Sequence, residues 1–226
     1  ALRGNSGGRS LFAVTCQSVN TESENLWRGT SSDERAAERR GRLVAACRQI
    51  VGSDGSAALT VRAVCRVAGV GPKNFYAGFP DTDALLLATY DRAVAQLLSA
   101  VAAAAIPVAD EQNTARGTLR HVFEAAVAHL EQHPDEGRII FAEALTNDVL
   151  RTRATVTLPA FLEGVGQLVP MPTGEPGAFR RGGLTSTLLS GALAAVFIEW
   201  LSGTVEFSRD ELIDRCTDFT WRTLSN

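Results

Sequence analysis

The sequence predicts an all-α protein in which a small N-terminal head precedes a larger helical body. Apolar residues recur at three- and four-residue intervals, capping residues and glycines mark the ends of these segments, and no convincing strand pattern occurs. Of the 226 residues, 45% are apolar and 21% are charged, which is typical of a folded globular protein and excludes a disordered or collagen-like chain. A chain of this length can build a hydrophobic core without crosslinks.

Residues 1–33 are predicted to form a flexible N-terminal arm. They are rich in Gly, Ser, Asn and Thr and show no sustained apolar periodicity. The sequence assigns this arm no function.

The head is predicted to span residues 34–80 and to contain three helices. The first is expected from Glu34 to about Ser53, where Asp54-Gly55 supplies a left-handed stop. Thr60 can cap a second helix over residues 61–68 that ends at Gly69, and Pro72 suits the first turn of a third. Three short helices with a glycine turn between the second and third predict a helix-turn-helix.

Charge is distributed unevenly along the chain. Residues 35–79 hold seven Arg and Lys73 against Glu38 and Asp54, although the whole chain has a net charge of −3. A basic head on an acidic body predicts that the head binds a polyanion, whereas a chance cluster of solvated arginines is the alternative.

The body is predicted to span residues 81–226. Its helices are expected at 81–105, 114–132, 134–146, 148–169, 179–201 and 209–224, with a loop at 170–177. Pro159 is expected to bend the helix that contains it, and Ser208 with Glu211 forms a capping box at the start of the last helix.

Residues 42–86 resemble the DNA-binding domain of the tetracycline-repressor (TetR) family. The similarity is carried by Leu59-Thr60-Val61-Arg62, by Ala68 to Tyr76, and by Phe79-Pro80 through Ala84-Leu85-Leu86. The resemblance implies DNA contacts by Arg42, Thr60, Arg62, Gly71, Pro72, Lys73, Asn74, Tyr76 and Thr82. Gly71 departs from the usual capping Ser, and Thr82 replaces a Lys that often reaches the DNA backbone, so binding weaker than usual is expected.

The same resemblance implies a ligand-responsive transcriptional regulator that acts as a repressor. Its partners would be double-stranded DNA with a palindromic operator, a second copy of the chain in a homodimer, and a small molecule that releases the DNA. Lys73 can donate to guanine or phosphate, and Asn74 can pair with adenine or contact phosphate.

The body is predicted to hold the ligand and the dimer contact. Aromatic and apolar residues of the body are spaced as core residues, and four of them, Phe123, Phe141, Leu145 and Phe161, are also candidate ligand contacts. His121 is a fifth candidate, with a solvated or pocket-edge position as the alternative. Two apolar stripes on the last helices give five candidate interface residues, which are Ala192, Val196, Leu212, Cys216 and Phe219. The acidic body favours a mainly apolar, neutral or cationic effector.

Other chemistries have weaker support in the sequence. No Gly-x-Ser-x-Gly elbow or phosphate-loop glycine pattern occurs, so no enzymatic activity and no cofactor are expected. His129 and His133 are better explained by a helix C-terminus than by a metal site, and Cys47 and Cys65 by buried faces than by a redox switch. The alternative function is a helical small-molecule-binding protein or enzyme with a degenerate DNA-binding head.

Localisation is predicted to be cytoplasmic. The four cysteines are too sparse for a disulfide framework, which indicates a reducing compartment. The longest apolar run is interrupted by Glu199, so no membrane span of about 20 residues is expected.

Overall fold

The computed structural model describes residues 19–105, 115–169 and 183–224, with side chains from residue 32 onward. The chain divides into two compact units, Ala1–Gly41 and Arg42–Asn226. The first helix, α1 (Val19–Asp54), contributes to both units, and all the other described elements belong to the second. The predicted head-body boundary at residues 80 and 81 stays a prediction.

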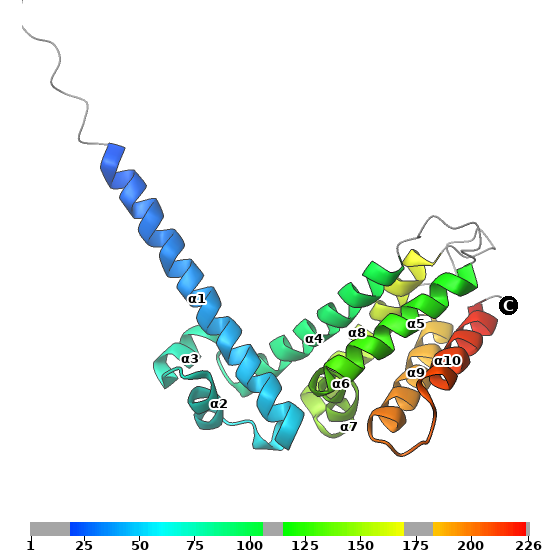
Figure 1. The fold of residues 1–226 in the computed structure, drawn as a ribbon. Helices are drawn as coiled ribbons and strands as arrows, with labels where there is room; N and C mark the ends of the chain where they lie inside the picture. The colour runs from blue at the N-terminus through cyan, green and yellow to red at the C-terminus, as the bar shows by residue number, and fades with distance from the viewer. Residues whose placement is uncertain (1–18, 106–114, 170–182, 225–226) are drawn as a thin grey trace, which may run out of the picture. The chain divides into compact units, whose positions relative to one another are not determined.

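The helix-turn-helix elements follow the end of α1 in the second unit (Figure 1). They are a short 3₁₀ turn, η1 (Ser56–Ala58), and the helices α2 (Val61–Ala68) and α3 (Pro72–Gly78). The Thr60 hydroxyl oxygen accepts from the Ala63 N–H at 3.1 Å, which confirms the predicted cap of α2. Gly69 ends α2 at φ 63°, a left-handed conformation that favours glycine.

The body contains the remaining described helices. They are α4 (Thr82–Ala104), α5 (Ala115–Gln132), α6 (Pro134–Gly137), η2 (Arg138–Ala142), α7 (Glu143–Thr146), α8 (Asp148–Leu168), α9 (Leu184–Leu201) and α10 (Arg209–Leu224). Helix α4 packs against α5 and α8, whereas α10 packs against α5 and α9. Their apolar faces form one core with the helix-turn-helix, and its members include Leu43, Phe75, Leu86, Val127 and Leu150.

The first helix begins earlier than predicted. It starts at Val19 rather than Glu34, so the prediction of a flexible arm is wrong for residues 19–33. Extending an existing helix adds one hydrogen bond for each residue that is fixed, whereas starting a helix is costly, so a segment without apolar periodicity can continue the helix that follows it. Residues 1–18 lie outside the described residues.

The predicted helix at 134–146 is present but contains a π-helical turn. Its middle section, η2, widens the helix between α6 and α7. Such turns occur often at functional sites, because they displace side chains from their usual register. The predicted helix at 179–201 is shorter in its described part, since Gly183 caps α9 and Leu184 begins it.

Two of the described helices, α4 and α9, are long and apolar enough to cross a membrane by length and composition alone. The expectation that no stretch of the chain has that length and apolar character is therefore wrong, because it considered only uninterrupted apolar runs. Helix α4 buries a large apolar face in the core of the body, including Leu85, Leu86 and Leu97, which gives its hydropathy a structural reason.

Candidate DNA-binding surface and effector cavity

Helix α3 is held in place by an apolar anchor on its inner side. Phe75 is completely buried, and its ring lies 6.5 Å from that of Phe79 and 5.3 Å from that of Tyr76, measured between centroids. Gly71 caps α3 through its backbone carbonyl, which accepts from the N–H groups of Asn74 and Phe75. The cap therefore needs no side chain, and the departure at Gly71 leaves α3 intact.

The residues predicted to contact DNA lie at the surface. Eight are exposed, namely Arg42, Thr60, Arg62, Gly71, Pro72, Lys73, Asn74 and Tyr76, whereas Thr82 is half-buried at the start of α4. Tyr76 leaves 58% of its surface in solvent despite its aromatic ring. The Thr60 oxygen is used by the α2 cap, which leaves its hydroxyl proton to donate to a phosphate.

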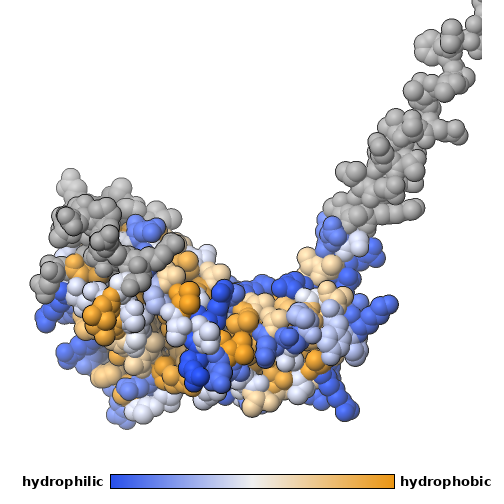
Figure 2. All heavy atoms as spheres, turned by 180° about the vertical axis from the view of Figure 1, so that it is seen from behind, coloured by the Kyte–Doolittle hydropathy of each residue, from blue (hydrophilic) through white to orange (hydrophobic). Residues whose placement is uncertain are grey.

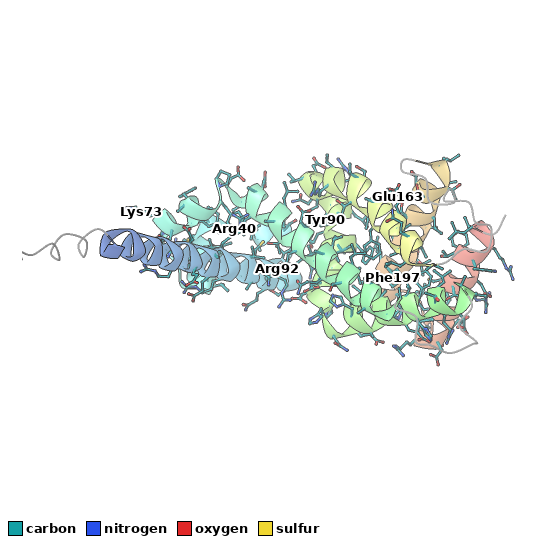
Figure 3. All side chains as sticks on the ribbon, turned by 90° about the horizontal axis from the view of Figure 1, so that it is seen from above. Arg40, Lys73, Tyr90, Arg92, Glu163 and Phe197 are labelled. Atoms are coloured by element: carbon teal, nitrogen blue, oxygen red, sulfur yellow. The ribbon has the colours of Figure 1, made fainter. Side chains whose placement is uncertain are left out.

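Lys73 is the single lysine of the chain. It stands in the first turn of α3, where its side chain is exposed (Figure 3). The side chains of Lys73, Asn74 and Tyr76 thus place a cation, an amide and a phenol on one short helix. These groups can donate to base edges and phosphates.

An apolar cavity of about 70 Å³ lies inside the helical body. Side chains from α4, α5, η2, α8, α9 and α10 line it. Phe141 of η2 stacks on Phe197 of α9 at its wall, with ring centroids 5.6 Å apart and planes inclined by 9°. Phe197 lies among the helices of the body in Figure 3. Among the described residues, those that line the cavity include no charged side chain.

Three of the five predicted ligand contacts line this cavity, namely Phe123, Phe141 and Phe161. His121 does not, because it lies on the exposed side of α5. Leu145 does not either, since 61% of its surface is exposed at the outer end of α7. For His121, the alternative of a solvated histidine therefore holds. The prediction for Leu145 took apolar spacing as a sign of an inward direction, and the π turn in η2 shifts the register that would have carried this side chain inward.

Two cavity-lining hydroxyls, Ser190 and Thr220, were not predicted. The Ser190 hydroxyl donates to the Thr187 carbonyl at 2.9 Å, whereas the buried Thr220 hydroxyl has no hydrogen-bond partner in the described parts of the chain. Thr220 does not belong to the apolar stripe on α10 that includes Cys216. Its position in the cavity wall follows from the packing of α10 against α5, which the sequence does not show.

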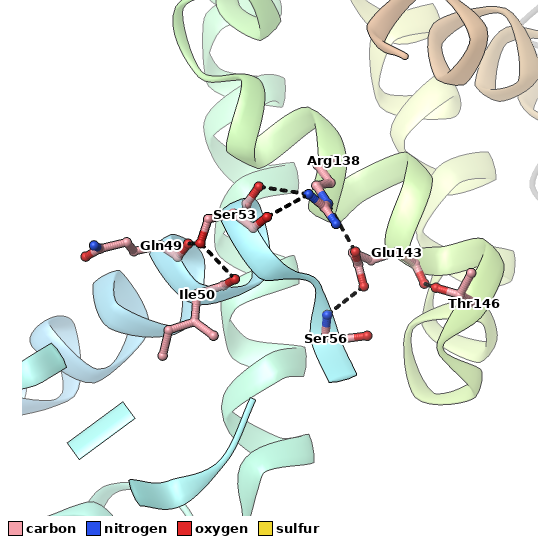
Figure 4. Close-up of polar contacts among 8 residues, drawn as sticks. Gln49, Ile50, Ser53, Ser56, Arg138, Glu143 and Thr146 are labelled. Atoms are coloured by element: carbon pink, nitrogen blue, oxygen red, sulfur yellow. Dashed lines mark hydrogen bonds and ion pairs between the residues drawn. The ribbon is translucent and has the colours of Figure 1, made fainter. Parts of the chain in front are cut away.

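A network of polar contacts joins the helical body to the end of α1 (Figure 4). The Arg138 guanidinium donates to the carbonyls of Gly52 and Ser53 at 3.2 and 3.1 Å, and to the Glu143 carboxylate at 3.2 Å. The second oxygen of Glu143 accepts from the Ser56 N–H at 2.8 Å. Glu143 is therefore a buried structural partner rather than a solvated side chain or a cavity residue.

A second buried carboxylate lies nearby. Glu136 is fully buried and accepts from the Arg48 guanidinium of α1 at 2.8 Å, and its other oxygen lies 2.9 Å from Nε2 of His129. Arg48 also pairs with Asp135 at 3.1 Å. His129 therefore has a structural partner within the body.

The thiols of the core are poor nucleophiles. Burial raises the pKa of Cys47 to about 11, although a hydrogen bond with Thr89 acts in the opposite direction. Burial also raises the pKa of Cys216 to about 11. Cys65 is half-buried rather than buried as predicted.

Helices α9 and α10 leave apolar side chains at the surface. A groove of about 380 Å³ between them brings together all five predicted interface residues. Leu212 and Cys216 are buried within the chain, Ala192 and Val196 are half-buried, and Phe219 is 47% exposed. Leu184 and Leu188 of α9 expose 75% and 63% of their surface. Figure 2 shows one face of the molecule, where apolar side chains reach the surface between polar ones.

The fold matches 104 chains of solved structures. A TetR-family transcriptional regulator from Rhodococcus sp. has a TM-score of 0.62 at 18% identity, over 83% of this chain and all (100%) of that chain. A fatty acid degradation regulator from Bacillus halodurans has a TM-score of 0.59 at 14% identity, over 81% of this chain and 94% of the other. A multidrug-binding protein complexed with imidazole has a TM-score of 0.54 at 22% identity, over 82% and 94%.

No protein-family model and no curated protein matches the sequence. At these identities the structural likeness establishes the fold, so the chain has the fold of TetR-family transcriptional regulators. The resemblance drawn from residues 42–86 is thus confirmed at the level of architecture.

Proposed function

We propose that the protein is a transcriptional regulator that binds operator DNA as a homodimer and responds to a small molecule held in its helical body. The observation that carries this proposal is the exposed polar face of α3, in a chain whose overall fold is that of TetR-family regulators. A short helix anchored by a buried Phe75 and presenting Lys73, Asn74 and Tyr76 fits the major groove.

A homodimer would place two such helices about one turn of DNA, roughly 34 Å, apart, so the operator should be palindromic. The apolar groove between α9 and α10 supports this arrangement, because it gathers half-buried and exposed apolar residues beside the exposed Leu184 and Leu188. Two copies that pair along these helices would form a four-helix bundle.

The contact between η2 and α1 supports a route from effector to DNA. Phe141 lines the cavity, while Arg138 in the same π turn holds the carbonyls of Gly52 and Ser53 at the end of α1. An effector that displaces Phe141 would move Arg138 and therefore the helix that positions the helix-turn-helix. A coupling of about 1–3 kcal/mol between effector and operator is expected.

The first test is selection of bound sequences from a random duplex pool, followed by lysine acylation of the complex. A palindrome should emerge, and operator DNA should protect Lys73 from acylation, which peptide mass spectrometry reads without interference because the chain has no other lysine.

Lys73→Ala should weaken binding by about 1–3 kcal/mol if it reads a base. Arg151→Ala, which removes one exposed charge from α8, is the matched control and should leave affinity unchanged. An unprotected Lys73 or an affinity indifferent to salt would contradict DNA binding through α3.

The homodimer is tested by Leu188→Glu. Because 63% of this side chain is exposed, a carboxylate there should leave the fold intact but convert the dimer to a monomer in sedimentation. Val156→Glu on α8, where 68% of the side chain is exposed, should remain dimeric. Dimeric Leu188→Glu protein would exclude this face as the interface.

A further inference from the structure

The cavity in the body contains one polar group whose hydrogen-bonding capacity is unused. Of the two hydroxyls that line it, Ser190 donates to the Thr187 carbonyl at 2.9 Å. Thr220 is 2% exposed, and its Oγ1 has no hydrogen-bond partner among the residues that the structure describes. Buried polar groups are nearly always paired, so an unpaired hydroxyl in a cavity wall points to a missing partner.

The neighbouring threonines of α10 show that the helix offers an internal solution. Thr217 donates to the Ile213 carbonyl, and Thr223 to the Phe219 carbonyl, both at 2.7 Å. Thr220 does not form the corresponding bond with the carbonyl four residues earlier. Its hydroxyl is thus left available on the side of α10 that meets the cavity.

The charges of the body restrict which partner can occupy the cavity. The arginines of the middle helices pair with carboxylates at the surface, as Arg116 does with Asp218, Arg120 with Asp214 and Arg153 with Asp91. None of these arginines lines the cavity, and Arg151, which lines a surface groove between α8 and α9, pairs with Asp148 at 2.6 Å. A carboxylate or phosphate bound there would be buried without a counter-charge, which is strongly unfavourable.

The space for a ligand is available beside the cavity. A surface groove of about 290 Å³ between α8 and α9 shares several wall residues with it, namely Ile140, Phe141, Leu158, Ser190 and Ala194. The cavity alone is below the roughly 300–1,000 Å³ of small-molecule sites. The shared wall includes Phe141 of the π turn. Displacement of this wall would join the cavity and the groove into one space.

We propose that the Thr220 hydroxyl is the hydrogen-bonding anchor of the effector, and that the effector is a neutral, mainly apolar molecule with one carbonyl or hydroxyl group. This inference rests on the proposed function, since it names the ligand class of the effector cavity. Thr220 determines specificity for the polar group, while the aromatic wall binds the apolar part.

The test uses three matched ligand series on the full chain. They are methyl ketones from hexanone to dodecanone, the methyl-branched alkenes in which carbon replaces the carbonyl oxygen, and fatty acids of the same lengths. Calorimetry measures their affinity for the unaltered protein and for Thr220→Val, which keeps the shape of the side chain but removes the hydroxyl. Thr217→Val is the matched control, because Thr217 is equally buried on α10 but does not line the cavity.

The ketone preference is the ratio of ketone affinity to alkene affinity, and in the unaltered protein it includes the gain of about tenfold expected for one hydrogen bond. Thr220→Val should lower this preference about tenfold and leave alkene affinity unchanged, whereas Thr217→Val should retain it. Tightest binding by the fatty acids, absence of ketone binding, or a preference that is as large in Thr220→Val as in the unaltered protein would overturn the proposal.

Operator binding is measured for the same three proteins without ligand. If all three lack operator binding while the ketone preference behaves as expected, the anchor stands and the proposed regulator function fails. If operator binding is normal and Thr220→Val leaves the preference unchanged, the regulator function stands and the anchor fails.

Discussion

Replacement of Glu143 should reveal how strongly the body holds the end of α1. In Glu143→Ala, the Ser56 N–H loses a carboxylate acceptor at 2.8 Å and Arg138 loses its ion pair. A hydrogen bond to a charged group contributes about 1.5–3 kcal/mol, and loss of one partner of a fully buried ion pair costs about 3–5 kcal/mol.

The cost of losing the ion pair is smaller than about 3–5 kcal/mol here, because 41% of the Arg138 side chain is exposed. The contacts of Arg138 with the carbonyls of Gly52 and Ser53 also remain in the variant. We therefore expect Glu143→Ala to lower the free energy of unfolding by about 2–3 kcal/mol. Glu143→Gln keeps an oxygen acceptor for the Ser56 N–H and should cost only about 1 kcal/mol.

Urea unfolding followed by circular dichroism measures both variants. Arg151→Ala is the control, since it removes an ion pair with Asp148 whose partners are 61% and 82% exposed, and such pairs contribute about 0–1 kcal/mol. The reasoning is refuted if Glu143→Ala costs no more than Arg151→Ala. If Glu143→Gln is as damaging as Glu143→Ala, the bond to Ser56 is not the main contribution.

Two further predictions concern the head and the thiols. Gly69→Ala should destabilise the protein by about 1–2 kcal/mol, because φ is 63° and only the backbone is strained in open space; Gly41→Ala, also in open space but inside α1, should instead stabilise it slightly in the same urea titration. At neutral pH, iodoacetamide should modify Cys65 before Cys47 or Cys216 in peptide mass spectrometry, and equal rates would show that the buried thiols are accessible. Because the folded pKa of Cys47 and Cys216 is about 11 against an ordinary 9.0, protonated thiols favour the folded state, and stability should fall as the pH rises from about 9 to 11. Replacement of both by Ala should flatten that decline, and an unchanged decline would assign it to other groups.

Residue spacing along the chain was enough to predict α2, α3 and the side chains that they expose. Thr60, Gly69 and Pro72 specify local backbone geometry through a cap, a left-handed turn and a first helical turn, and these depend on residues a few positions apart. The exposure of Lys73 and Asn74 follows from the burial of Phe75 on the opposite side of the same short helix. Local interactions of this kind can be deduced from spacing.

Which side chains of the body contact one another could not be predicted from spacing, because it depends on how the helices pack. Leu145 shares the apolar spacing of Phe141, yet it lies at the surface, because the direction of a side chain depends on which neighbours its helix packs against and on the π turn. The unpaired hydroxyl of Thr220 becomes apparent only where several helices converge. Spacing along one helix fixes which residues share a face, but the partner of that face is set by contacts between residues far apart in the chain.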